Sequence, residues 1–309
     1  MMDIFESRLA KPMLVKSETE PFDSADYIFE LKLDGERCIA YLDKSGTELI
    51  NKRNVKMLSK FPELSGIHKQ VKKKCILDGE LMVSIRGIPN FDEVKRRSLT
   101  SNKFRVESLS SRYPATFTAF DILYYDGKQV TVLPLIERKK LLEKAFVESD
   151  RLARSRFIEE RGKALFEMTA KEGLEGLIAK RKDSLYSMGE KTRDWVKIKN
   201  LKDDDFVVCG YIVQDNGVAS IILGQYSNDK MVYKGHVILG LNRAEFDMIK
   251  KQATAVPPFE EAEEGAIYIE PNLVCVAKFI DWTINGGLRQ PVFKGLRFDK
   301  EPKECVINT

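Results

Sequence analysis

Histidine and closely spaced cysteines are scarce in this chain. Its 309 residues include two histidines, His68 and His236, and five cysteines, no two of which have CxxC spacing. A structural zinc site or a disulfide framework needs several such side chains at defined spacings, so we expect neither. A nucleophilic triad built on histidine would have to use one of the two, and we do not expect one.

Long apolar runs are also absent from the sequence. No stretch approaches the roughly 18 consecutive apolar residues that a membrane-spanning helix needs. Residues 1–8 contain acidic side chains and no apolar core, which argues against a secretory signal peptide. We therefore expect no membrane partner and a cytoplasmic location. Because 43% of the residues are hydrophobic, the chain can bury substantial cores, and its length favours about two domains.

Positive charge is distributed unevenly along the chain. Residues 204–309 contain 11 Lys and Arg against 15 Asp and Glu, whereas residues 1–203 contain 40 against 32. The first part therefore carries a net charge of +8 and the second a net charge of −4. A basic segment of this size favours an anionic partner such as a nucleotide or a nucleic acid, although an uneven surface charge alone would give the same count.

The first part of the chain alternates β-rich runs with charged helical stretches. Residues 27–33 and 75–83 are predicted strands, the second at the edge of a hairpin. Further strands are expected at 37–42, 115–125, 177–180 and 195–199, and helices at 135–145 and 162–172.

The pattern changes after residue 199. A polar break at 200–205 is followed by predicted strands at 206–214, 219–226, 231–239 and 272–282 and by one helix at 243–252. Several short strands with one helix favour a small β-barrel such as an OB-fold. The sequence thus predicts an α+β protein with two domains, residues 1–203 and 204–309, and a hinge at 201–205.

A lysine with distinctive neighbours lies in the segment Glu30-Leu31-Lys32-Leu33-Asp34-Gly35-Glu36-Arg37. Lys32 is predicted on a strand just before an Asp-Gly turn, which can expose its amine at the edge of a pocket. Four further elements follow in order: Asp78-Gly79-Glu80, Phe120-Asp121, the segment Glu175–Lys180, and the segment Trp195–Lys199. Because strand side chains alternate with a period of two, Lys197 and Lys199 share one face of their strand.

Together these five elements resemble the covalent nucleotidyltransferases, and within them the ATP-dependent DNA ligases. Arg53-Asn54 is similar to the short arginine motif that follows the nucleophile strand. Residues 279–283 and 287–300, which end in Arg297-Phe298-Asp299-Lys300, are similar to the end of the ligase module of bacterial non-homologous end-joining ligases. The resemblance covers nearly the whole chain. It implies a nucleotidyltransferase domain of ATP-grasp-like antiparallel sheets with helices, followed by an OB-fold β-barrel.

The resemblance implies three chemical steps with Lys32 as the catalytic nucleophile. A lysine amine attacks only when deprotonated, and neighbouring cations such as Lys197 and Lys199 disfavour its charged form. The amine would attack the α-phosphorus of ATP and expel pyrophosphate, with Mg²⁺ or Mn²⁺ neutralising the phosphates. AMP would then pass to the 5′-phosphate of nicked duplex DNA, and the 3′-hydroxyl would displace it.

Roles for the other residues follow from the same resemblance. Glu30 would recognise the adenine amino group, Phe120 would stack on the ring, Arg37 and Glu80 would hold the ribose, and Glu175 would bind the metal. The remaining predicted contacts are to phosphates and involve Lys197, Lys199, Arg53 and Arg193, and also Arg297, Asp299 and Lys300 when the OB domain swings over the site.

Two basic segments, Lys95-Arg96-Arg97 and Lys103-Phe104-Arg105, are candidates for DNA contacts. They are predicted to be polar loops that reach backbone phosphates or are simply solvated. Only a short segment precedes Lys32, so we expect no separate N-terminal DNA-clasping domain and a minimal, monomeric two-domain ligase. A sliding clamp or an end-binding protein is the candidate protein partner.

Three alternatives remain open at this point. An RNA ligase and an mRNA-capping guanylyltransferase use the same lysine and Asp-Gly turn, and an OB-fold can bind nucleic acid without catalysis. The extended match at residues 279–300 favours a DNA ligase over the first two. The complete set of Lys32, Glu80, Glu175, Lys197 and Lys199 weighs against the third.

Overall fold

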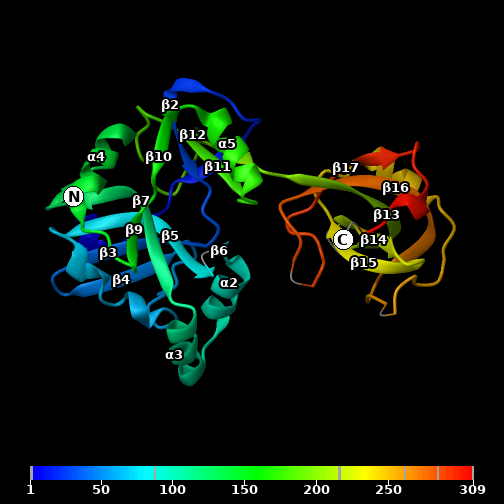
Figure 1. Ribbon diagram of the computed structural model, residues 1–309, viewed down its shortest axis with the longest axis horizontal. Coiled ribbons are helices and arrows are strands. Elements are labelled where there is room, and N and C mark those ends of the chain that lie inside the picture. Colours follow the sequence, from blue (N-terminus) through cyan, green and yellow to red (C-terminus); the bar gives the residue numbers. More distant parts are fainter. Residues whose placement is uncertain (1–2, 87, 215–216, 261, 284, 308–309) are drawn as a thin grey trace. The chain divides into compact units, whose positions relative to one another are not determined.

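The chain divides into two compact units, residues 1–200 and 201–309 (Figure 1). The computed structural model describes residues 3–86, 88–214, 217–260, 262–283 and 285–307. The sequence places the boundary slightly later, after residue 203. The described helices all fall short of the length and apolar content needed to span a membrane.

The first unit contains two β-sheets with helices. Its strands are β1 (Leu14–Glu18), β2 (Ser24–Leu31), β3 (Glu36–Asp43), β4 (Gly46–Asn51), β5 (Cys75–Ile85), β6 (Ile88–Pro89), β7 (Ala115–Tyr125), β8 (Lys128–Gln129), β9 (Leu152–Arg154), β10 (Phe157–Glu160), β11 (Gly176–Arg181) and β12 (Lys191–Lys199). Its helices are α1 (Ile4–Ser7), α2 (Phe91–Leu99), α3 (Lys103–Arg112), α4 (Leu135–Ala145) and α5 (Gly162–Lys171), with 3-10 turns η1 (Pro62–Leu64) and η2 (Ile67–Gln70). One sheet has the order β1-β12-β11-β2-β10. The other has the order β4-β3-β5-β7-β8, with β6 beside β5 and β9 beside β7.

Alternation along the strands divides the apolar side chains among three layers. Tyr41 of β3 and Trp195 of β12 belong to the cluster between the two sheets. Ala40, the neighbour of Tyr41, belongs to the core on the opposite face of its sheet. On the outer face of the five-stranded sheet, Phe29 of β2 packs with Leu165 of α5. The sheets thus face each other across a mixed apolar and polar layer, which contains the candidate site.

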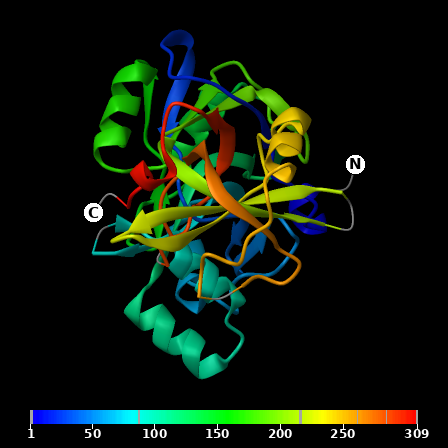
Figure 2. The ribbon, with the colours of Figure 1, turned by 90° about the vertical axis from the view of Figure 1, so that its right-hand side faces the viewer.

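Two predictions about the first unit are wrong. The strand at 75–83 is not an edge, because β5 pairs with β3 on one side and β7 on the other. The two basic segments are helices rather than loops, and Figures 1 and 2 show α2 and α3 projecting from the sheets. Asn90 and Asn102 cap these helices, because their side chains accept hydrogen bonds from the backbone of Glu93 (2.8 Å) and Arg105 (3.1 Å).

The second unit is a five-stranded barrel with one α-helix among its described residues. It comprises β13 (Lys202–Val213), β14 (Ala219–Ser227), β15 (Lys230–Val237), α6 (Arg243–Lys250), β16 (Ile267–Phe279), β17 (Val292–Arg297) and the 3-10 turn η3 (Pro302–Glu304). The strand order is β15-β14-β13-β16-β17, and a parallel bridge between Leu239 and Val292 joins the two edges. Helix α6, gold in Figure 2, adds Phe246 and Ile249 to the barrel core. The α+β class and the OB-fold are confirmed.

The polar break predicted at residues 200–205 is wrong from residue 202 onward, whereas the hinge at 201–205 stays a prediction. Strand β13 begins at Lys202, which pairs with Phe279 of β16, and the pairing continues through the acidic run. Two cations neutralise the Asp205 carboxylate within this strand: Arg297 Nη1 lies 2.9 Å and Lys300 Nζ 2.7 Å from Asp205 Oδ2. The connection between β12 and β13 is therefore confined to residues 200 and 201.

Candidate active site

Lys32 lies at the end of β2, where the antiparallel partner strand β11 begins. Leu31 pairs with Leu177, and the backbone N–H of Lys32 donates to the carbonyl of Gly176 (2.8 Å). This pairing brings Glu175 beside Lys32, with Glu175 Oε1 2.6 Å from Lys32 Nζ. The side chain of Lys32 is 19% exposed and that of Glu175 is 4% exposed, so the amine is the accessible member of the pair. Lys32 is the first residue after the strand rather than part of it.

Strand β12 adds two further cations to the same sheet. Lys197 pairs with Ile178 of β11, which in turn pairs with Glu30 of β2, so these three side chains form a row across the sheet. Burial, followed by the charges of Lys32 and Lys199, lowers the pKa of Lys197. The structure therefore gathers the three predicted lysines at one end of the five-stranded sheet.

The Lys199 ammonium has its own counter-charge, since its Nζ lies 2.9 Å from Glu18 Oε2 of β1. Strand β1 pairs in parallel with β12 and was not predicted from the sequence. Glu18 is therefore a neighbour of the site that sequence reasoning missed.

Glu30, the predicted adenine contact, lies in a buried cluster of charges. Lys180 Nζ is 3.0 Å from Glu30 Oε2, and Lys139 forms an ion pair with the other carboxylate oxygen. Burial lowers the pKa of Lys180 to about 8, against the opposing effect of the Glu30 carboxylate. Lys180 belongs to a segment that the sequence singles out, whereas Lys139 is one of several charged residues on α4 and carries no signal of its own.

Phe120, the predicted stacking residue, lies on β7 among aromatic rings and cations. Its ring is 6.2 Å from that of Trp195 in an edge-to-face arrangement. Lys180 Nζ lies 4.5 Å from the centre of the Phe120 ring, and the Arg37 guanidinium carbon lies 5.1 Å from it. An aromatic wall with cations nearby suits a flat base followed by a negatively charged phosphate chain.

Arg37 and Glu80, the predicted ribose contacts, lie opposite each other on β3 and β5. Asp78 accepts two hydrogen bonds from the Arg37 guanidinium, at 3.0 and 2.6 Å, and a further one from the hydroxyl of Tyr186. Burial raises the pKa of Glu80 to about 8, although Arg37 and then Lys32 oppose this rise. Asp78 and Tyr186 therefore fix the guanidinium in place. Asp78 belongs to the sequence motif Asp78-Gly79-Glu80 but has no predicted role in it, and nothing in the sequence points to Tyr186.

Arg53 and Arg193 both have exposed side chains. Arg53 follows β4 in a turn held by Asn51, whose side-chain oxygen accepts from the backbone of Arg53 at 3.0 Å. Arg193 lies within β12, just ahead of the strand segment predicted from the sequence. It is two residues before Trp195 and four before Lys197, which places all three side chains on one face of the strand.

The last motif belongs to the second unit. Arg297 makes two hydrogen bonds to Asp299, at 3.0 and 2.8 Å. Its Nη1 atom and Lys300 Nζ both donate to Asp205 Oδ2 of β13, at 2.9 and 2.7 Å. Asp205 is the residue that orders this motif, and its place in an acidic run concealed that role.

Metal-ligating side chains are sparse around Lys32. Within the described ranges, no three His, Cys, Asp or Glu side chains are grouped as they would be in an all-protein metal site. Glu175 is a single carboxylate beside the Lys32 amine. That arrangement fits Mg²⁺, which is commonly held by one or two carboxylates together with substrate phosphates.

Comparison with known proteins identifies the family. Residues 8–199 match the model described as the ATP-dependent DNA ligase domain, and residues 214–300 match the ATP-dependent DNA ligase C-terminal region. The chain is 30% identical to the multifunctional non-homologous end-joining DNA repair protein LigD of Mycobacterium tuberculosis over 98% of its own length. It spans only 40% of that relative.

Two further similarities cover almost the whole of both chains. The SPβ prophage-derived DNA ligase-like protein LigB of Bacillus subtilis is 29% identical, with 93% of this chain and 98% of LigB covered. The solved structure of mycobacterial DNA ligase D complexed with ATP and MES has a TM-score of 0.57 and 28% identity, and the match covers 97% of this chain and 98% of that one. The chain belongs to the ATP-dependent DNA ligase family, whose general activity is the sealing of nicks in DNA.

Proposed function

We propose that Lys32 is the residue that takes up AMP from ATP and that this chain seals 5′-phosphate/3′-hydroxyl nicks in duplex DNA. The observation that carries the proposal is the placement of Lys32 Nζ 2.6 Å from Glu175, at the same end of the five-stranded sheet as Lys197 and Lys199. A nucleophilic amine, a carboxylate and phosphate-binding cations are the groups that nucleotidyl transfer needs.

In the first step the Lys32 nitrogen forms a bond to the α-phosphorus of ATP, and the bond from that phosphorus to the pyrophosphate oxygen breaks. The amine must first give up a proton, and Glu175 is the nearest described carboxylate. Lys197 and Lys199 are placed to stabilise charge on the α-phosphate as pyrophosphate leaves. Mg²⁺ or Mn²⁺, held by Glu175 and the phosphates, would supply further charge neutralisation.

The nucleotide contacts in this proposal follow the geometry of the first unit. Glu30 would accept a hydrogen bond from the adenine amino group, and the base would stack on Phe120. Glu80 and Arg37 would lie at the ribose, with Arg53 and Arg193 contributing exposed positive charge for phosphates. Arg297 and Lys300 of the second unit would orient the leaving pyrophosphate, with Asp205 holding both side chains before they engage.

DNA contacts outside the reaction centre are proposed for α2 and α3. Lys95, Arg96, Lys103 and Arg105 have exposed side chains and suit the DNA backbone. Arg97 is excluded from that role, because it is 1% exposed and lies 2.6 Å from Glu63. Repair of DNA breaks is the proposed role, as the name of the LigD relatives suggests, and we expect it in the cytoplasm. We expect a monomer that works alone or with a clamp or an end-binding protein.

The test is covalent labelling followed by ligation. Wild-type protein is incubated with labelled ATP or labelled GTP and Mg²⁺, and a protein-bound label is expected with ATP only. Lys32→Ala should abolish the label, whereas Lys128→Ala, at an exposed lysine of β8, should retain it. Nicked DNA should then be sealed in preference to nicked RNA. A protein–GMP product, or label that survives Lys32→Ala, would contradict the proposal.

A further inference from the structure

A buried ion cluster links the two sheets of the first unit at the predicted adenine contact. Glu30 of β2, Lys180 of β11 and Lys139 of α4 are 2%, 2% and 6% exposed. Lys180 Nζ lies 3.0 Å from one carboxylate oxygen of Glu30, and Lys139 contacts the other. Burying three charges is costly unless they are well paired, so this arrangement has to be compensated by its contacts.

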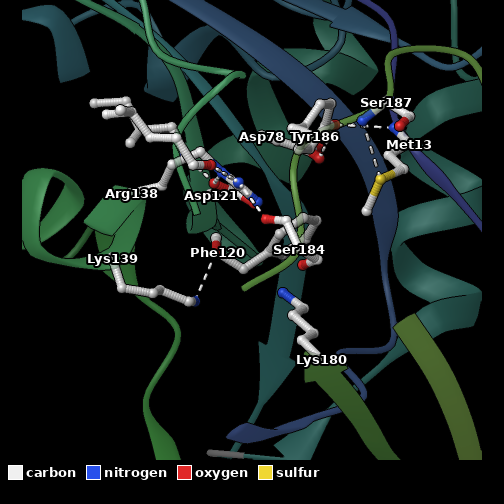
Figure 3. Close-up of polar contacts among 12 residues, drawn as sticks. Met13, Asp78, Phe120, Asp121, Arg138, Lys139, Lys180, Ser184, Tyr186 and Ser187 are labelled. Carbon is white, nitrogen blue, oxygen red and sulfur yellow. Dashed lines mark hydrogen bonds and ion pairs between the residues drawn. The ribbon is translucent and has the colours of Figure 1, made fainter. Parts of the chain in front are cut away.

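Lys139 has a second contact that joins it to the other sheet. Its Nζ donates to the backbone carbonyl of Phe120 on β7, at 2.6 Å. In Figure 3 the side chains of Lys139 and Lys180 both point toward Phe120. The Lys139 ammonium group thus contacts both the Glu30 carboxylate, which we propose binds the adenine amino group, and the backbone of Phe120, which we propose stacks on the base.

The position of Lys139 is fixed by the preceding residue. Arg138 forms a doubly hydrogen-bonded pair with Asp121, at 2.8 and 2.9 Å, and both side chains are fully buried. Arg138 also donates to the backbone carbonyls of Leu133 (2.6 Å) and Ser184 (2.8 Å). Figure 3 shows the contact with Ser184. Since α4 is anchored in this way, Lys139 has little freedom to move from Glu30.

Glu30 presents a carboxylate, flanked by the Lys139 and Lys180 ammonium groups, to a bound base. An ionised carboxylate only accepts, with about four lone-pair sites, so the contacts to Lys139 and Lys180 leave capacity for another donor. A 6-amino purine offers an N–H donor to this carboxylate, whereas a 6-oxo purine offers an acceptor and would be repelled.

We propose that Lys139 is a positioning residue for purine recognition: by fixing the Glu30 carboxylate and tying it to the backbone of Phe120, it gives the site its preference for 6-amino over 6-oxo purine nucleotides. The inference rests on the proposed function, since it takes Glu30 and Phe120 as the base contacts. Lys139 itself acts through these two residues and does not touch the reacting atoms.

We expect the fold to tolerate removal of the Lys139 charge. Lys139, Lys180 and Glu30 together carry one excess positive charge, so a neutral side chain at 139 leaves the balanced Lys180–Glu30 pair. Lys139→Met tests the loss of both contacts. Lys139→Gln tests the loss of charge while an amide can still donate to the Phe120 carbonyl, and Lys139→Arg tests whether a cation restores selectivity. Lys140→Met is the matched control, because Lys140 is exposed and pairs with Glu137 on the same helix.

The experiment measures the rate of protein–nucleotide adduct formation with full-length protein, Mg²⁺, and each of three nucleotides: ATP, GTP, and purine riboside triphosphate, which lacks the 6-amino group. The wild type and Lys140→Met should prefer ATP. In Lys139→Met and Lys139→Gln the preference for ATP over purine riboside triphosphate should fall at least about tenfold, as expected for the loss of one charge-assisted hydrogen bond. In the same two variants the rate of adduct formation with GTP should rise relative to the rate with ATP. Lys139→Arg should recover part of the preference for ATP.

The outcomes separate this inference from the proposed function. If both neutral variants slow adduct formation equally for all three nucleotides, Lys139 is merely structural and the inference is wrong. An unchanged ATP preference in Lys139→Gln, with wild-type thermal stability, would also overturn it. If the wild type forms no adduct with any nucleotide, the proposed function fails.

Discussion

Lys32 Nζ and Glu175 Oε1 lie 2.6 Å apart although 143 residues separate them in the sequence. The antiparallel pairing of β2 with β11 sets this distance, because the end of one strand faces the beginning of the other. The carboxylate holds the amine in the site before any nucleotide arrives. If Glu175 binds the metal as proposed, the metal and the ATP phosphates have to share or replace this ion pair.

Glu175→Gln is expected to weaken the apparent affinity for Mg²⁺ in adduct formation selectively. The amide keeps the shape of the side chain but loses the charge that would hold Mg²⁺. We predict that the Mg²⁺ concentration giving half-maximal adduct formation rises roughly 10- to 100-fold, the range seen when a metal-site residue is changed. A Mg²⁺ titration with labelled ATP measures this effect. Glu172→Gln, at an exposed acid after α5, is the control; an equal shift in both variants would show a general charge effect.

Glu80 should make the stability of the protein depend on pH. Burial raises its pKa to about 8 in the folded state, whereas an unfolded chain titrates near about 4.3. Between these values the folded state binds more protons than the unfolded state, so the free energy of unfolding decreases as pH rises toward 8.

Glu80→Gln is predicted to remove that contribution, which for one proton is at most ~1.4 kcal/mol per pH unit. Urea unfolding at several pH values between 5 and 8 measures the slope for wild type and variant. Glu107→Gln, at an exposed residue of α3, provides the comparison and should leave the slope unchanged. Identical slopes in wild type and Glu80→Gln would contradict the raised pKa.

The sequence predicts elements well where the signal is local. The apolar run of β7 and the amphipathic α4 are predicted with the bounds that the structure shows, because each pattern is complete within its own segment. The segment around Lys32 likewise predicts a lysine at the end of a strand, as the structure shows, and strand alternation predicts the pair of lysines on β12. Both inferences need only the period of a strand or helix and the chemistry of one short motif.

Long-range charge pairing explains the predictions that failed. The acidic run at 202–205 is typical of a loop because Arg297 and Lys300, which neutralise Asp205, lie 92 and 95 residues away. The sequence does not distinguish Arg97 from its solvated neighbours, because its ion-pair partner Glu63 lies 34 residues earlier. Lys139 carries no motif, and only the tertiary fold brings it to Glu30. Such partners become visible only when separate segments are placed together.

Arg97 is expected to stabilise the folded state. Its guanidinium pairs with Glu63 and donates to the backbone carbonyls of Tyr113 (2.8 Å) and Lys60 (3.0 Å). Arg97→Met leaves the Glu63 carboxylate without this partner, and breaking a buried pair in this way costs about 3–5 kcal/mol. Urea unfolding measures the loss. A variant of wild-type stability that binds nicked DNA more weakly would instead assign Arg97 to the DNA interface.

Lys103 and Arg105 are expected to behave in the opposite way. Both side chains are exposed at the start of α3, so Lys103→Gln with Arg105→Gln should change the stability by less than about 0.5 kcal/mol. If they bind phosphates, the plot of log affinity for nicked DNA against log salt should become less steep by about 0.9 for each phosphate that is no longer neutralised. Binding measured at several salt concentrations tests this, and an unchanged slope would remove α3 from the DNA interface.

Asp205→Asn should separate the first chemical step from the last. The Asp205 carboxylate holds both Arg297 and Lys300, which are proposed to orient pyrophosphate only while Lys32 takes up AMP. Loss of the carboxylate charge leaves two cations without a shared acceptor, so we predict roughly tenfold slower adduct formation from ATP, about 1.4 kcal/mol in the barrier. Sealing of a nick that already carries AMP on its 5′-phosphate should keep its wild-type rate, because no pyrophosphate leaves in that reaction. Asp203→Asn, at an exposed residue of the same strand, controls for the change in charge; if Asp205→Asn slowed both reactions equally, the motif would serve the barrel's stability and not the first step.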